Sequence, residues 1–88
     1  MKLDKPVQKK GVQARELGDE WLLYDPGTGS VHIVNPVAEF VWSRCDGRHS
    51  LADIEKEVRS AFSVPERTDV SGHLKNVLQS FKEIGIMV

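Results

Sequence analysis

The spacing of apolar residues changes once along this chain of 88 residues, close to Val34. Before that position, short runs alternate apolar and polar residues, a pattern that is typical of half-buried strands. After it, apolar residues recur every three or four positions, which is the period of an amphipathic helix. A chain of this length supports a single hydrophobic core, so the change predicts a small sheet followed by helices that share one core.

The first part of the chain predicts three strands, within residues 11–17, 20–25 and 30–34. The dipeptide Gly18-Asp19 and the segment from Pro26 to Gly29 separate them, and both are strong turn signals. Strands joined by such short turns pair with their neighbours in antiparallel order. The sequence therefore predicts a three-stranded antiparallel meander.

The second part predicts three helices, each with its own start and stop signals. Asn35 is expected to cap the first helix, with Pro36 at its first position, and Asp46-Gly47 to end it. Ser50 is expected to start the second, and the third is expected to begin between Pro65 and Asp69 and to end at Gly85. The apolar stripes predicted to face the core are Val37, Ala38, Val41, Trp42 and Cys45; Leu51, Ile54, Val58 and Phe62; and Val70, Leu74, Val77, Leu78, Phe81 and Ile84.

These elements together predict the fold class α+β, with a winged helix-turn-helix-like arrangement in which a three-stranded antiparallel sheet precedes three helices. Residues 11–88 are predicted to form the domain. Residues 1–10 contain four lysines, one aspartate and Pro6, and are predicted to be a flexible tail. The apolar residues 86–88 are expected to fold back on the core.

The overall charge argues against several partners. The formal net charge of −1 and the pI near 6.3 provide no general attraction for nucleic acid or for an anionic membrane. The longest strongly apolar stretch is WLLY, which is too short for a signal peptide or a membrane span. A single cysteine forms no internal disulfide, which agrees with a reducing compartment, and the chain is predicted to be cytoplasmic.

Cys45, Asp46 and His49 lie within five positions of one another, which raises the possibility of a reactive or metal-binding cluster. The thiol, however, is predicted to lie at the C-terminal end of a helix and on its buried stripe, where both the helix dipole and burial oppose ionisation. Structural zinc needs ligands in closely spaced pairs, and His32 and His73 are too far along the chain to form them. We therefore predict a joint between two helices, with no catalysis, metal or cofactor.

The stretch VNPVAEFVWSRCDGRHSLADI, with LLY before it and FSVP, DV and EIGIM after it, resembles the PqqD family from about residue 12 onwards. The resemblance implies a small, non-catalytic winged-helix protein. Such proteins bind the leader segment of a ribosomally made precursor peptide and present it to a modifying enzyme, typically a radical S-adenosylmethionine enzyme. The matching residues are Leu23, Tyr24, Asn35, Ala38, Trp42, Cys45, Asp46, Gly47, Asp69, Val70 and Gly85.

The chain also departs from the family pattern. Val34 stands where leucine is usual, and DPGTGS replaces a shorter turn found in members of the pyrroloquinoline quinone pathway. The departures leave open whether the pathway is pyrroloquinoline quinone biosynthesis or another.

A leader peptide bound in the family's manner adds as a strand to an open sheet edge. The last strand, residues 30–34, is predicted to have such an edge, with the third helix forming a groove beside it. Lys75 and Lys82 are candidates to meet acidic leader residues. The predicted peptide-binding residues are Val31, His32, Ile33, Val34, Val70, Leu74, Lys75, Val77 and Leu78.

The alternative function for this fold class is a DNA-binding winged-helix regulator, whose third helix enters the major groove. The exposed side of the third helix carries Lys75 and Lys82 against Asp69 and Glu83. A surface of balanced charge neutralises few phosphates, and affinity for DNA depends largely on those contacts. The sequence therefore favours peptide binding over nucleic acid.

Overall fold

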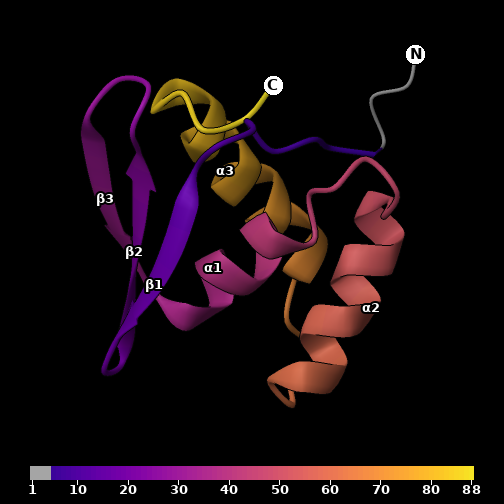
Figure 1. Ribbon diagram of the computed structural model, residues 1–88. Helices are drawn as coiled ribbons and strands as arrows, with labels where there is room; N and C mark the ends of the chain where they lie inside the picture. Colours follow the sequence, from indigo (N-terminus) through magenta and orange to yellow (C-terminus); the bar gives the residue numbers. More distant parts are fainter. Residues whose placement is uncertain (1–4) are drawn as a thin grey trace.

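The computed structural model describes residues 5–88, which form three strands followed by three helices (Figure 1). The predicted α+β order and the winged helix-turn-helix-like arrangement are confirmed. Among the described residues, no helix has the length and apolar character that a membrane span requires. The elements are β1 (Gln13–Leu17), β2 (Glu20–Asp25), β3 (Ser30–Val34), α1 (Pro36–Ser43), α2 (Leu51–Ala61) and α3 (Val70–Glu83).

The sheet is an antiparallel meander in the order β1-β2-β3, as predicted. Leu23 of β2 is fully buried, whereas every residue of β1 is exposed. Asp25, at the end of β2, is also buried; it accepts a hydrogen bond from Lys9 Nζ at 2.7 Å and another from the backbone N–H of Gly27 at 3.0 Å. The Lys9 hydrogen bond, more than any other contact, lowers the pKa of Asp25. The sheet thus covers the helices with one face and leaves the other to solvent.

Side-chain caps fix where the helices begin. Asn35 Oδ1 accepts a hydrogen bond from the backbone N–H of Ala38 at 2.7 Å, and Pro36 occupies the first turn of α1. Ser50 and Asp53 exchange side-chain to backbone hydrogen bonds, both 3.1 Å long, in a reciprocal cap of α2. Asp69 caps α3 in the same way as Asn35 caps α1. These starts agree with the sequence prediction.

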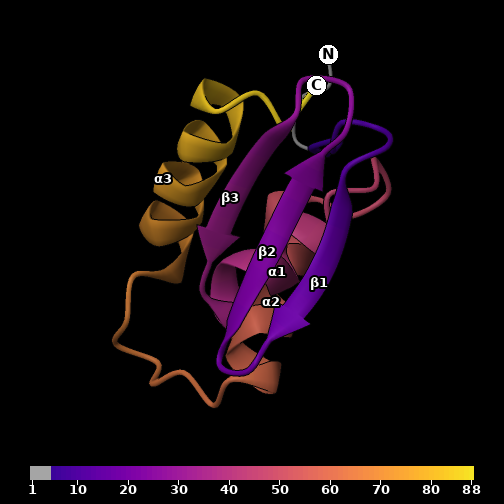
Figure 2. The same cartoon turned by 60° about the vertical axis from the view of Figure 1, so that its left-hand side comes forward.

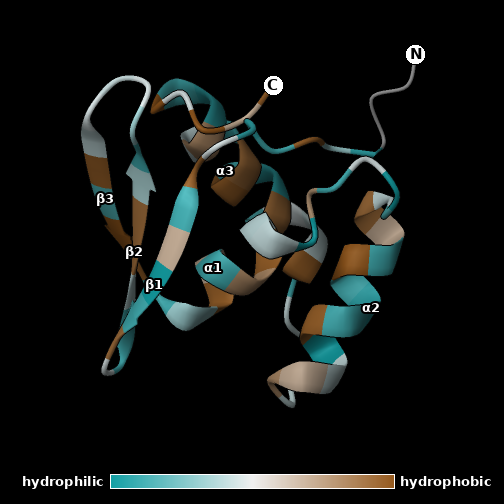
Figure 3. Cartoon of the chain, viewed as in Figure 1, coloured by the Kyte–Doolittle hydropathy of each residue, from teal (hydrophilic) through white to brown (hydrophobic). Residues whose placement is uncertain are grey.

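The apolar faces of the helices meet in one core (Figure 3). Two residues of the predicted stripes are exceptions: the side chains of Phe62 and Ile84 are 37% and 40% exposed. Each follows the last residue of its helix, so the helical period no longer directs it inward. Phe62 instead packs edge-on against Phe40, with the ring centroids 5.4 Å apart. The buried core consists of Leu23, Val41, Trp42, Cys45, Ile54, Val58, Val70, Leu74, Leu78, Phe81 and Ile86.

The described part of the N-terminal segment lies against the domain. The backbone N–H of Gln8 donates to the carbonyl of Cys45 at 2.7 Å, and that of Lys9 donates to the carbonyl of Ile86 at 2.9 Å. Ile86 is fully buried, so the prediction that the C-terminal residues fold back is confirmed. The flexibility predicted for residues 1–10 stays a prediction, and residues 1–4 lie outside the described part. The domain was predicted to begin at residue 11, but residues 7–9 also form backbone hydrogen bonds with it.

Candidate functional site

The outer edge of β3 is unpaired. Across residues 5–88, β3 pairs only with β2, in the register Leu22 with Ile33 and Leu23 with His32. Figure 2 shows α3 beyond β3, on the opposite side of the sheet from β1. In an antiparallel strand every second residue turns its backbone N–H and C=O away from its partner strand. This surface, residues Ser30–Val34, is called the β3 edge below, and it offers unpaired backbone donors and acceptors.

Side chains of the β3 edge alternate between two environments. Val31 and Ile33 lie on the solvent face of the sheet and are 52% and 51% exposed. His32 and Val34 are partly buried on the other face, and Val34 packs against the core. The Nε2 atom of His32 is buried and has no hydrogen-bond partner within the described part of the chain. The strand therefore exposes two apolar side chains and holds one ring nitrogen buried without a hydrogen-bond partner.

The predicted binding residues of α3 lie in two environments, and their role in binding stays a prediction. Val70 and Leu74 are buried in the core, and Val77 is partly buried against it. Lys75 and Leu78 line a groove with the N- and C-terminal segments, and no residue of β3 lines that groove. Ile84, which the sequence predicts to lie in the core, follows the last residue of α3 and is exposed. Its position just past the helix end was the signal that it is not a core residue.

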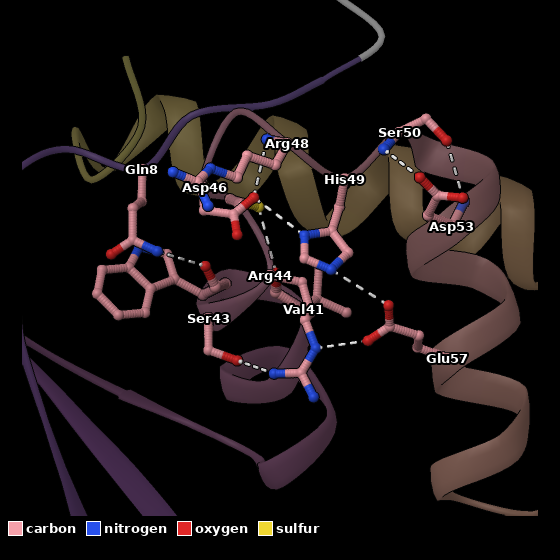
Figure 4. Close-up of polar contacts among 12 residues, drawn as sticks. Gln8, Val41, Ser43, Arg44, Asp46, Arg48, His49, Ser50, Asp53 and Glu57 are labelled. Carbon is pink, nitrogen blue, oxygen red and sulfur yellow. Dashed lines mark hydrogen bonds and ion pairs between the residues drawn. The ribbon is translucent and has the colours of Figure 1, made fainter.

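The cluster around Cys45 is a joint between α1 and α2, as predicted, and residues 44–50 are called the helix joint below (Figure 4). Asp46 Oδ1 lies 3.0 Å from His49 Nδ1, and His49 Nε2 lies 3.2 Å from Glu57 Oε2. Glu57 Oε1 in turn accepts a 2.6 Å hydrogen bond from Arg44 Nε. α1 ends at Ser43, a little before the predicted end at Asp46-Gly47, and Gly47, with a φ of +80°, turns the chain within the joint. The polar side chains of the joint are thus used to hold the two helices together.

Electrostatics in the helix joint oppose a reactive thiol. Cys45 is fully buried and its Sγ lies 3.2 Å from the carbonyl oxygen of Val41. Burial, and secondarily the charge of Asp46, raises the pKa of Cys45 to about 12. The hydrogen bond from His49, followed by that from the backbone N–H of Arg48, lowers the pKa of Asp46 to about 2. A neutral, enclosed thiol is a packing group and not a nucleophile.

Metal-binding residues are also dispersed. Among residues 5–88, no group of three His, Cys, Asp or Glu side chains is placed to hold a metal ion. His49 lies between the carboxylates of Asp46 and Glu57 and is linked to both. These contacts between the helices account for the position of His49 near Cys45, so no bound metal is needed to explain it.

Comparison with known proteins assigns the fold to a family. The family model described as coenzyme PQQ synthesis protein D (PqqD) matches residues 20–87. The chain belongs to the PqqD family. No curated protein sequence matches the chain significantly.

Two solved structures share the PqqD-type fold of this chain. One is described as TbiB1 in complex with the TbiA(beta) leader peptide; it is 20% identical, with a TM-score of 0.74, over 92% of this chain and 93% of that one. The other is described as lasso peptide synthetase B1 complexed with the leader peptide; it is 21% identical, with a TM-score of 0.76, over 96% of this chain and 98% of that one. At this identity the likeness concerns the fold.

The residues that resemble the PqqD family have structural roles in this chain. Asn35 and Asp69 cap helices, and Gly47 and Gly85 adopt left-handed conformations after helices. The Trp42 indole N–H donates to the carbonyl of Ile86 at 3.3 Å. None of the matching residues belongs to the β3 edge. The family signature thus identifies the scaffold and does not mark the candidate binding surface.

Proposed function

We propose that this protein binds the leader segment of a ribosomally made precursor peptide as an added strand on the β3 edge and presents it to a modifying enzyme. The observation that carries the proposal is the open edge of β3 beside α3, in a PqqD-family fold. The two structures of the same fold are described as complexes with leader peptides, which supports this ligand class. Strand addition satisfies unpaired backbone groups whatever the side chains, so the mode suits an extended peptide.

The sheet has a second open edge, on β1, and the side chains distinguish the two. The exposed residues of β1 include Arg15 and Glu16, and charged residues on an edge discourage further pairing. β3 instead exposes Val31 and Ile33, which offer apolar contact to an added strand. Only β3 has α3 beside it to contact the other face of the leader (Figure 2). The proposal therefore assigns the leader to β3.

His32 supplies a further reason to expect a ligand at this edge. A buried nitrogen without a hydrogen-bond partner costs free energy, on the order of 1–3 kcal/mol. His32 Nε2 is in that state within residues 5–88. A polar group of the leader, placed beside β3, is proposed to supply the missing partner.

The protein is proposed to bind without catalysing a reaction. Its one thiol is buried with a raised pKa, and its His-carboxylate network holds helices together. The chemistry on the precursor is accordingly assigned to a separate enzyme, which we propose is a radical S-adenosylmethionine enzyme, acting in the cytoplasm where precursors are made. DNA binding gains no support from the family or from the related structures.

Proline variants of β3 test strand addition. Proline lacks the backbone N–H, and an edge strand tolerates it where that N–H faces outward. Of His32→Pro and Ile33→Pro, we expect one to remain folded and to bind the cognate leader at least about tenfold more weakly, or about 1.4 kcal/mol. The His32→Ala and Ile33→Ala variants are the matched controls, because they remove the side chain and keep the N–H.

The measurement is a titration of ¹⁵N-labelled protein with the leader of the neighbouring precursor gene. We expect the largest amide shifts in residues 30–34 and along α3. A folded proline variant that binds as tightly as its alanine control excludes strand addition. Shifts confined to regions away from the β3 edge exclude the proposed site.

A further inference from the structure

A groove of about 440 Å³ lies between α3, residues 5–7 of the N-terminal segment and the C-terminal residues Met87 and Val88. Its apolar lining includes Val7, Leu51, Leu78 and Met87, contributed by the N-terminal segment, α2, α3 and the C-terminal segment respectively. The volume is within the range of about 300–1,000 Å³ that is usual for binding pockets. The groove is therefore large enough to receive an apolar side chain and its neighbours.

Three lysines, Lys5, Lys75 and Lys82, also line this groove, and no acidic side chain does. None of the three forms an ion pair with another residue in the part of the chain that the structure describes. Lys75 and Lys82 are two turns apart on one face of α3, so their charges lie along one side of the groove. The chain as a whole has a net charge of −1, so this positive rim is a local feature and not an average property.

The groove is separate from the proposed leader site. None of its lining residues belongs to the sheet, and the α3 residues that line it lie on a different side of the helix from Val77. A protein that presents a leader to an enzyme must contact both at once. A leader on the β3 edge leaves this groove open for the second contact.

We propose that the groove docks an acidic, amphipathic segment of the modifying enzyme, an inference that rests on the function proposed above. An apolar side chain of that segment enters between Leu78 and Met87, and flanking carboxylates meet Lys75, Lys82 and Lys5. Exposed ion pairs contribute little individually, so the apolar anchor supplies affinity while the lysines select an acidic partner. Lys75 and Leu78, which the sequence predicts to bind the leader, are thereby proposed to contact the modifying enzyme instead.

The test uses a charge-reversal variant and a matched control. Lys75→Glu combined with Lys82→Glu reverses the rim, and both side chains are exposed, so the fold is expected to persist. Lys56→Glu combined with Arg67→Glu changes the net charge equally; both residues are exposed and neither lines the groove. A third variant, Val88→Asp, places a carboxylate on the groove at a side chain that is 81% exposed.

Each variant is titrated with the purified modifying enzyme encoded beside the precursor gene, and separately with the leader peptide. We expect the rim variant and Val88→Asp to lose enzyme affinity by about tenfold or more, because like charges meet at the contact. The control pair is expected to bind the enzyme as the parent does. All variants are expected to bind the leader with unchanged affinity.

The outcomes separate the two proposals. If the rim variant binds the enzyme as tightly as the parent, the groove assignment is overturned, even if leader binding is intact. It is also overturned if the control pair loses as much enzyme affinity as the rim variant. A rim variant that loses the leader and keeps the enzyme assigns the groove to the leader and also overturns it. A parent protein that binds the enzyme and not the leader contradicts the proposed function and leaves the groove assignment standing.

Discussion

The helix joint and the β3 edge use their polar groups in opposite ways. In the joint, Asp46 lies 3.0 Å from His49, His49 lies 3.2 Å from Glu57 of α2, and Cys45 is enclosed. At the β3 edge, backbone groups and the ring nitrogen of His32 lack partners within residues 5–88. The residues whose chemistry suggests a reactive site therefore stabilise the fold. The β3 strand, whose exposed side chains are apolar, is the element that keeps unpaired hydrogen-bonding groups.

The largest expected effect lies beside the joint, at Trp42. Its side chain is buried and its indole N–H bonds the carbonyl of Ile86, so Trp42→Ala removes both packing and a tether to the C-terminal segment. We expect a loss of about 3–5 kcal/mol in the free energy of unfolding, measured by urea denaturation. Trp42→Phe, which keeps the ring and loses the donor, is expected to lose less. Equal losses for the two variants contradict a packing role.

Substitution of Cys45 is expected to destabilise the fold less than substitution of Trp42, and it separates a packing role from a binding role. Because the thiol is treated as packing, Cys45→Ala is expected to lower the free energy of unfolding by about 1 kcal/mol and to leave leader affinity unchanged. In the folded parent, thiol reagents at neutral pH are expected to react slowly, since the pKa of Cys45 is about 12. A folded Cys45→Ala variant that no longer binds the leader would assign the joint a role in binding.

The dependence of stability on pH tests the network around His49. The hydrogen bond to Asp46 raises the pKa of His49, opposed in part by desolvation, so protonated His49 is favoured in the folded state. The contribution of protonated His49 to the free energy of unfolding is fully present below the ordinary histidine pKa of about 6.5. It is lost as the pH rises through the raised pKa of the folded state. The advantage of the parent over His49→Gln in the free energy of unfolding should therefore be largest below about pH 6.5 and shrink as the pH rises above it. An advantage that stays constant over this range argues against the contact with Asp46 and Glu57.

The smallest expected effect on stability is at the β3 edge itself. Ile33 is 51% exposed, so Ile33→Thr should change the free energy of unfolding by no more than about 0.5 kcal/mol. Leader affinity should nevertheless fall about fourfold, or about 0.8 kcal/mol, because apolar contact with the added strand is reduced. Leu17→Thr on β1, at a side chain that is 44% exposed, is the control and should leave affinity unchanged. If both variants weaken binding equally, the leader is not specific to β3.

Local signals made most of the fold predictable. The turn residues and caps, such as Asn35 and Ser50, act within a few positions of the chain, and the corresponding starts are found in the structure. The packing of residues 7–9 on Cys45 and Ile86 was not predictable, because it depends on backbone hydrogen bonds between distant segments, which side-chain patterns do not encode.

The candidate site was less predictable than the fold. Alternation along β3 separates Val31 and Ile33 from His32 and Val34, but it does not say which pair faces solvent. Similarly, one turn of α3 contains Leu74, Lys75 and Val77, and only the packing of neighbouring segments assigns Lys75 to a groove away from β3. Which surface of an element is free depends on tertiary contacts that a single sequence leaves open.

The hydrogen bond from the backbone N–H of Val88 to the carbonyl of Val7, 2.9 Å long, brings the two ends of the domain to one place. In Figures 1 and 2 the indigo segment that begins at residue 5 and the yellow C-terminal segment lie on the same side of the molecule. A unit whose entry and exit points adjoin can be inserted into a surface loop of a host protein without stretching either linker. Such a graft would carry the β3 edge intact, so this geometry suits the domain to serve as a transferable recognition module in engineered enzymes.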